Sequence, residues 1–236
     1  VVVPNLAIAA VSPLMAFYNP DPGMAQQRAR LVDDLEQEGR PGLAEQLSIT
    51  WVRYPESLRR RAASLQPEEF WGQAPAGASW GGERQRYPAS VVKLVYLVAA
   101  EAWLQLRLIE DEPELRRALA DMIRDSGNDA TSLVMDRLSG TTSGPDLPPE
   151  RFAEWVAQRQ LVNRWLEDLG WPELRGTNAC QKTWGDGPYG RERAFYGDQL
   201  ENRNRLSSDA TARLLHAVIA GALVSPPACR RMRVLL

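Results

Sequence analysis

Residues 87–106, YPASVVKLVYLVAAEAWLQL, constrain the fold more than any other segment of this chain. The run has the length of a helix, and Lys93 is the only charged side chain between Arg86 and Glu101. Apolar residues fall on every side of it, which is typical of a helix buried all round, and it is too short and interrupted to span a membrane. We therefore expect a central buried helix that contains one lysine.

Ser90 lies three residues before Lys93, so the two side chains share one face of the predicted helix. Burial favours the neutral amine and lowers its pKa, and a serine beside a basic lysine is a nucleophile with its base. Pro88 would start the helix and place Ser90 in its first turn, where the dipole favours an oxyanion. A purely structural alternative stays open, in which Lys93 pairs with a buried carboxylate such as Glu101 or Asp125.

Composition excludes several functional classes. The chain has 236 residues, 44% of them hydrophobic, and a net charge of −2, which is typical of a soluble globular protein without a nucleic-acid-binding surface. Cys180 and Cys229 are far apart and form no CxxC pair, and His216 is the only histidine. We expect no metal and no organic cofactor, and the base of a serine hydrolase here would not be histidine.

The N-terminal region predicts no stable membrane span. Residues 1–18 are apolar but contain Pro4 and Pro13 and lack a basic start, so they form neither a complete signal peptide nor a spanning helix. They are either a trimmed signal or a segment packed on the core or on a partner. We divide the chain into an N-terminal segment, residues 1–23, and a single domain, residues 24–236.

Strand patterns are confined to the region before Ser90, and helices dominate the rest. Residues 47–54 alternate as a strand does, residues 78–87 form a weaker strand, and residues 57–78 predict a short helix and loop. The segment 171–197 is irregular and glycine-rich, as functional rims often are. Helices are expected at 24–39, 113–125, 129–138, 150–169 and 208–221, and from Pro226 onward.

A second polar motif, residues 125–128 (DSGN), falls at the break between two predicted helices. Structurally, Ser126 and Asp129 would form a capping box, or Asn128 would cap the next helix. Functionally, the Ser126 hydroxyl would relay a proton between Lys93 and a leaving group, and the Asn128 amide would hold a substrate carbonyl. Both interpretations can hold for one turn.

Three segments in order, SVVKL, then ALADMIRDSGNDATSLVMDRLSG, then NRNRLSSDATARLLHAVIAGALVSPPACRRMRVLL, resemble the penicillin-recognising serine enzymes, specifically the class A β-lactamase branch. The resemblance covers residues 47–236. It implies an α+β fold, with a helical lobe packed on an antiparallel sheet and the site between them, and a periplasmic or cell-envelope location. By position, Ser90 would be the acylated nucleophile, Lys93 its base partner, and Ser126 and Asn128 the S-x-N residues, with Gly127 replacing the more usual aspartate.

Three departures from this family pattern limit what the resemblance implies. The loop glutamate that activates the deacylating water falls near Cys180, and Glu192 or Asp186 could replace it only by a different loop path, so the acyl-enzyme should turn over slowly. The short span from Lys93 to Ser126 should leave the pocket more open. The family's strands with a K-[ST]-G motif would follow the last helix, beyond Leu236. We expect truncation, although another chain could supply them or the protein could fold otherwise.

The sequence thus predicts a serine hydrolase of the β-lactamase and penicillin-binding type. Its partner would be a small-molecule or peptidoglycan-like acyl substrate, bound by Asn128 and attacked by Ser90. Two alternatives stay open: a non-catalytic or weakly active relative that binds peptidoglycan or a protein partner, and an esterase that uses the same Ser–Lys pair. The pattern does not fix the oligomeric state.

Overall fold

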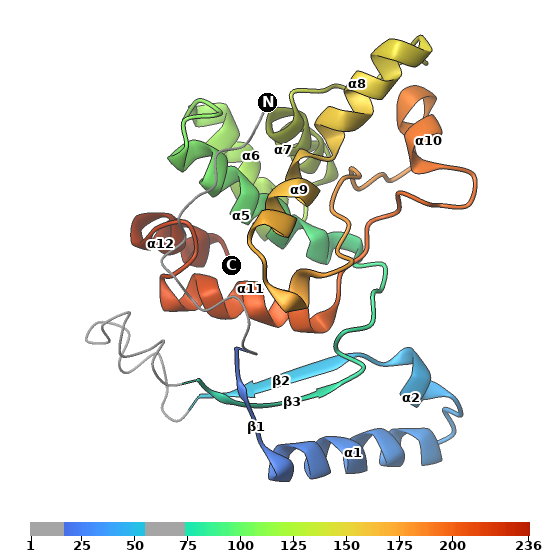
Figure 1. The fold of residues 1–236 in the computed structure, drawn as a ribbon, viewed down its shortest axis with the longest axis vertical. Coiled ribbons are helices and arrows are strands. Elements are labelled where there is room, and N and C mark those ends of the chain that lie inside the picture. The colour runs from blue at the N-terminus through green and yellow to red at the C-terminus, as the bar shows by residue number, and fades with distance from the viewer. Residues whose placement is uncertain (1–16, 55–73) are drawn as a thin grey trace.

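The computed structural model describes residues 17–54 and 74–236. Helix α1 (Pro22–Gln37) covers one face of a small sheet, and α11 (Ser208–Ala220) lies between the other face and the remaining helices (Figure 1). The expected α+β architecture is confirmed. Within the described residues, no helix is long and apolar enough to cross a membrane.

The sheet has three strands in the order β1-β3-β2 and is mixed rather than antiparallel throughout. Strands β2 and β3 pair antiparallel, as expected, whereas β1 runs parallel to β3. Helix α1 connects β1 at one edge of the sheet to β2 at the other. The strand expected at residues 78–87 lies earlier, as β3, because Gly81, at φ 53°, turns the chain directly after it. The strands are β1 (Asn19–Pro20), β2 (Ile49–Arg53) and β3 (Ala76–Trp80).

The division of the chain at residues 23 and 24 falls inside α1, and β1 hydrogen-bonds to β3, so residues from 19 onward are part of the domain's sheet. The short helix and loop expected at 57–78 lie mainly outside the described residues, as do residues 1–16.

Asp209 fixes the start of α11 on the sheet. Its carboxylate accepts hydrogen bonds from Thr50 Oγ1 on β2 at 2.5 Å and from Ser79 Oγ on β3 at 3.0 Å. Ser207 caps the same helix through a 3.0 Å bond from the Ala210 amide. The sheet therefore supports α11, on which the helical lobe is built.

The central helix is confirmed, although it starts later than expected. A 3-10 turn, η1, precedes α5, and every residue from Val92 to Trp103 is buried. The helix expected at 150–169 is broken at Gln160 into α8 and α9. The helical segments are α2 (Leu43–Gln46), η1 (Ala89–Val91), α5 (Val92–Gln105), α6 (Pro113–Arg124), α7 (Asn128–Ser139), α8 (Pro149–Arg159), α9 (Leu161–Asp168), η2 (Pro172–Leu174), α10 (Gly190–Tyr196) and α12 (Pro226–Leu235).

Glu101 ties three helices of the lobe together. Its buried carboxylate on α5 accepts from Arg116 Nη1 on α6 at 2.6 Å and from Arg231 Nη2 on α12 at 2.5 Å. Burying a carboxylate is tolerated when it is paired and hydrogen-bonded in this way. Because Glu101 is bound by arginines, it is not the partner of Lys93.

His216 makes the fold sensitive to acid. It lies buried on α11, with its Nδ1 2.8 Å from the Tyr54 hydroxyl, and burial together with the nearby Arg213 lowers its pKa to about 4. The unfolded chain binds this proton near pH 6.5, so stability is fully present above that pH and is lost as the pH falls from about 6.5 to about 4.

We predict that His216 contributes up to about 3 kcal/mol to the loss of unfolding free energy between pH 7 and pH 4. His216→Gln should have a flatter dependence over this range, because glutamine cannot take up the proton. Urea unfolding of both proteins at several pH values measures the difference. Parallel pH profiles for the two proteins would contradict the prediction.

Candidate active site

Lys93 on α5 and the turn between α6 and α7 are in direct contact. The Lys93 amine donates to the Ser126 carbonyl at 2.5 Å, to Ser126 Oγ at 2.9 Å and to Asn128 Oδ1 at 3.0 Å. The lysine is only 2% exposed. Three of the predicted site residues therefore meet around one buried amine, and its hydrogen-bond partners in the described structure are uncharged oxygens rather than Glu101 or Asp125.

Two opposing effects set the charge of Lys93. Burial lowers the pKa of its amine, and the negative charge of Asp121 raises it. An ammonium has three N–H donors, and the three oxygens accept all of them. When the amine is neutral it keeps two donors and gains a lone pair, which can take a proton from a hydroxyl. The arrangement suits both the base and its conjugate acid.

Ser90 lies one turn before Lys93, exposed on η1. The sequence places it in the first turn of the central helix, whereas the structure has a tighter 3-10 turn there, continuous with α5. Its hydroxyl makes no hydrogen bond to another side chain or backbone group in the described part of the chain. It is accessible to a ligand.

Backbone strain is present on both sides of the amine. Ala89, directly before Ser90, has φ 45°, and Ser126 has φ 56°. Non-glycine residues rarely adopt such angles, which cost about 1–3 kcal/mol each and persist only where the surrounding structure enforces them. Such residues cluster at functional sites, and here one directly precedes Ser90 and the other is Ser126 itself.

The expected capping interactions of this turn are wrong. Gly127 occupies the N-cap position of α7 and Asn128 the first helical position, without a side-chain cap. The side chains of Ser126 and Asn128 instead contact Lys93. The Ser126 hydroxyl thus lies within hydrogen-bond distance of the Lys93 amine, as a proton relay between them would need.

Thr183, which sequence reasoning did not single out, brings the irregular loop to the same place. Its hydroxyl donates to Asn128 Oδ1 at 2.8 Å, so Asn128 accepts from both Lys93 and the loop. The loop is anchored on α5 one turn beyond Lys93, where Tyr96 donates to the Gln181 carbonyl at 2.5 Å. The glycine-rich composition of the segment indicated a functional rim but not which residue reaches the lysine.

Glu192 and Asp186, the two residues considered for water activation, lie elsewhere. Glu192 on α10 is fully buried, and its carboxylate accepts from Arg159 and, at 2.8 Å, from Ser143. Asp186 lies exposed on a bend of the loop. Neither contacts Lys93, Ser126 or Asn128 in the described structure, so this loop path brings no carboxylate to the amine's hydrogen-bond partners.

Glu192 is part of a buried ion cluster made of Asp136, Arg159, Lys182 and Glu192. Lys182 Nζ lies 2.8 Å from Asp136 Oδ1, and Arg159 lies 3.5 Å from the same oxygen. The cluster joins α7, α8, α10 and the loop directly before Thr183. Its two positive and two negative charges compensate one another, which lets them be buried.

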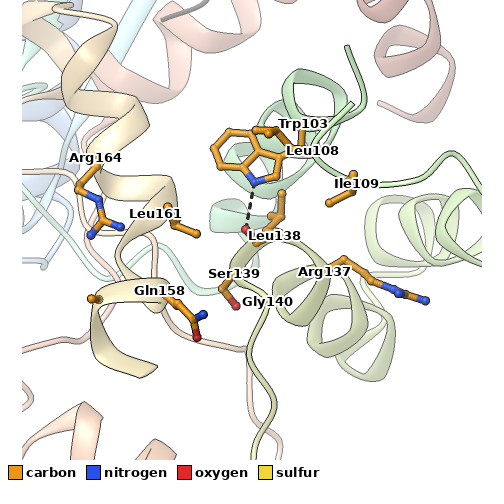
Figure 2. A pocket seen from close by; sticks show the side chains of 11 residues that line it. Trp103, Leu108, Ile109, Arg137, Leu138, Ser139, Gly140, Gln158, Leu161 and Arg164 are labelled. Atoms are coloured by element: carbon orange, nitrogen blue, oxygen red, sulfur yellow. Dashed lines mark hydrogen bonds between the residues drawn. The ribbon is translucent and has the colours of Figure 1, made fainter. Parts of the chain in front are cut away.

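A cavity of about 230 Å³ lies apart from these residues, between α5, α7, α8 and α9 (Figure 2). The Trp103 indole borders it and donates to the Leu138 carbonyl at 3.0 Å. None of Ser90, Lys93 and Ser126 lines this cavity.

Within the described residues, no group of three histidine, cysteine or acidic side chains is placed to hold a metal ion.

Comparison with known proteins identifies a family for more than half of the chain. The model of the β-lactamase enzyme family matches residues 103–236. No curated protein and no solved structure matches the chain. The matched region includes the turn with Ser126 and Asn128 and the loop with Thr183, and it begins after Ser90 and Lys93. It spans more than half of the sequence, and the chain therefore belongs to the β-lactamase enzyme family.

Proposed function

We propose that this protein is a serine hydrolase of the β-lactamase and penicillin-binding type, in which an acyl group is transferred to Ser90. The observation that carries this proposal is the buried amine of Lys93, held by Ser126 and Asn128 one turn from an exposed serine. A small-molecule or peptidoglycan-like amide is the substrate class that fits the family.

The acylation step follows from these contacts. Neutral Lys93 takes the proton of the Ser90 hydroxyl while Ser90 Oγ bonds to the substrate carbonyl carbon. Backbone N–H groups at the start of η1 lack helical acceptors and can stabilise the oxyanion. As the carbon–nitrogen bond breaks, Ser126 gives its proton to the leaving nitrogen and regains one from Lys93, at 2.9 Å. Lys93 ends neutral, and Ser90 carries the acyl group as an ester.

Hydrolysis of that ester needs a base that activates a water molecule. The group that the irregular loop brings to the site is a hydroxyl, that of Thr183. Thr183 is the loop residue that contacts Asn128, and a threonine hydroxyl is not a base near neutral pH. The Glu192 carboxylate is engaged with Arg159. We infer that the acyl-enzyme is long-lived, as suits a penicillin-binding enzyme better than an efficient lactamase.

The role of Ser90 as the nucleophile can be tested by covalent labelling. The full-length protein should form a covalent adduct with a fluorescent penicillin, and Ser90→Ala should abolish it because no oxygen is left to acylate. Intact-mass spectrometry measures the adduct, and circular dichroism checks that the variant is folded. No adduct under conditions that label a control penicillin-binding protein would favour a non-catalytic relative, and turnover of p-nitrophenyl esters alone would favour an esterase.

The slow deacylation can be tested by placing a base at position 183. Thr183→Glu places a carboxylate beside Asn128 and should shorten the lifetime of the adduct at least about tenfold, since general bases contribute about 10²–10⁴-fold when well placed. Thr183→Gln, of the same size but without basicity, is the matched control. Decay of the adduct mass after removal of free penicillin gives the rate. Equal lifetimes in the two variants would show that this position does not limit hydrolysis.

Substitutions at Glu192 and Asp186 separate a role in stability from a role in activating water. Glu192→Gln leaves Arg159 with an unbalanced charge and should cost about 3 kcal/mol or more of unfolding free energy, without changing adduct lifetime. Asp186→Asn, on the exposed bend, should change stability by less than about 0.5 kcal/mol. Urea unfolding and adduct decay are measured on both variants. A stable Glu192→Gln protein whose adduct persists longer would instead assign water activation to Glu192.

A further inference from the structure

The carboxylate of Asp121 occupies the space beside Gly127. A Cβ atom on residue 127 would lie 2.5 Å from Asp121 Oδ1 and 2.9 Å from its Cγ, closer than real Cβ contacts. The backbone of Gly127, at φ −62° and ψ 124°, suits any residue. A side chain at 127 would therefore compete for space with the Asp121 carboxylate, and one of the two would have to move.

Asp121 also holds the backbone of the turn. Its carbonyl accepts the amides of Asp125 at 3.1 Å and Gly127 at 3.2 Å. These bonds lie on both sides of Ser126, whose left-handed backbone brings its carbonyl and hydroxyl to Lys93. One residue on α6 thus contacts the turn through both its backbone and its side chain.

The same carboxylate is the negative charge that acts on Lys93. Other charged groups near this helix are engaged elsewhere or exposed. On α5, Glu101 is held by Arg116 and Arg231. Lys182 on the loop is bound to Asp136 of α7, and Arg213 on α11 faces Glu173. Asp125 and Asp129 flank the turn but are exposed, as is Arg117, 3.9 Å from Asp121.

We propose that Asp121 is a positioning residue of the site: its backbone carbonyl holds the amides on both sides of Ser126, its carboxylate fills the space beside Gly127, and together they set the 126–128 turn against Lys93 with a negative charge near that lysine. The catalytic meaning of this arrangement rests on the proposed acylation of Ser90. The packing and the electrostatic effect can be measured without any substrate.

Charge and volume can be separated by substitution. Asp121→Asn keeps the shape of the side chain and removes its charge, whereas Asp121→Ala removes both. Asp129→Asn removes an exposed charge from the same turn and is the matched control. These variants allow each part of the proposal to fail independently.

The effect of the Asp121 charge can be measured as the pKa of the Lys93 side chain. The chain contains two, Lys93 and Lys182, so ¹³C-lysine labelling gives two side-chain signals, assigned with Lys182→Arg. Asp121→Asn should lower the pKa of Lys93, because the negative charge that favours the ammonium is removed, while Asp129→Asn leaves it unchanged. The rate of penicillin labelling should fall at acid pH as Lys93 takes up a proton. In Asp121→Asn this fall should move to lower pH by as much as the Lys93 pKa does, because more of the Lys93 amine is neutral at a given pH.

The packing part is tested by a double-mutant cycle. Gly127→Ala should lower the Tm by several degrees in the wild-type and Asp121→Asn backgrounds, where the carboxylate or amide blocks the new methyl group. It should be tolerated in Asp121→Ala. The combined variant Asp121→Ala/Gly127→Asp returns a carboxylate to the same space and should restore the pKa of Lys93 toward the wild-type value.

The proposal is overturned if the Lys93 pKa is unchanged in Asp121→Asn, or if Gly127→Ala has the same effect in every background. If penicillin labelling fails while the lysine titration and the cycle behave as expected, the proposed function is wrong and the role of Asp121 in the turn stands. If labelling succeeds and the titration does not move, the inference about Asp121 fails alone.

Discussion

The site depends on the burial of one amine among uncharged oxygens. A lysine in an all-round buried helix loses its hydration, and isolated burial of that charge would be costly. Here the burial of the amine is compensated by three hydrogen bonds that it donates to the turn between α6 and α7. Ser126 has a strained backbone, and in this conformation both its carbonyl and its hydroxyl accept from Lys93. The helices that carry this turn are themselves held against α5 by a shared apolar core, which includes Leu119 of α6 and Val134 of α7.

Two further sets of polar contacts hold the loop against this helix. The ion cluster fixes Lys182, the residue before Thr183, and Tyr96 binds the Gln181 carbonyl. Asn128 Oδ1 then accepts from Lys93 and Thr183 together. Because one oxygen serves both donors, displacement of the loop changes the surroundings of the amine. Loop position and lysine protonation are therefore thermodynamically linked, and each influences the other equally.

The sequence was informative where a pattern is local. The apolar run around a single lysine predicts α5, the three-residue spacing places Ser90 near Lys93, and the polar break at 125–128 predicts the turn. The 3-10 start of the helix was not predictable, since Pro88 is compatible with either helix type. Thr183 and Asp121 escaped notice because their contacts join segments distant in the sequence, and neither residue breaks a local pattern.

The same reasoning explains the errors. The parallel pairing of β1 involves two residues, too few for a periodicity to reveal. Glu192 in an irregular segment is indistinguishable from an exposed glutamate until Arg159, on another helix, is seen beside it. Burial of charge is a tertiary property, and sequence reasoning has least access to it.

The scarcity of lysine has a chemical consequence for handling this protein. Both lysines are almost fully buried and hydrogen-bonded, and every other basic side chain except His216 is an arginine. Surface coupling to carboxylic esters, aldehydes or other amine-directed reagents would find no exposed lysine on the folded domain. A reagent that did modify Lys93 would have to reach an amine that is 2% exposed or wait for the fold to open, so its rate would report access to the site as well as the basicity of the amine.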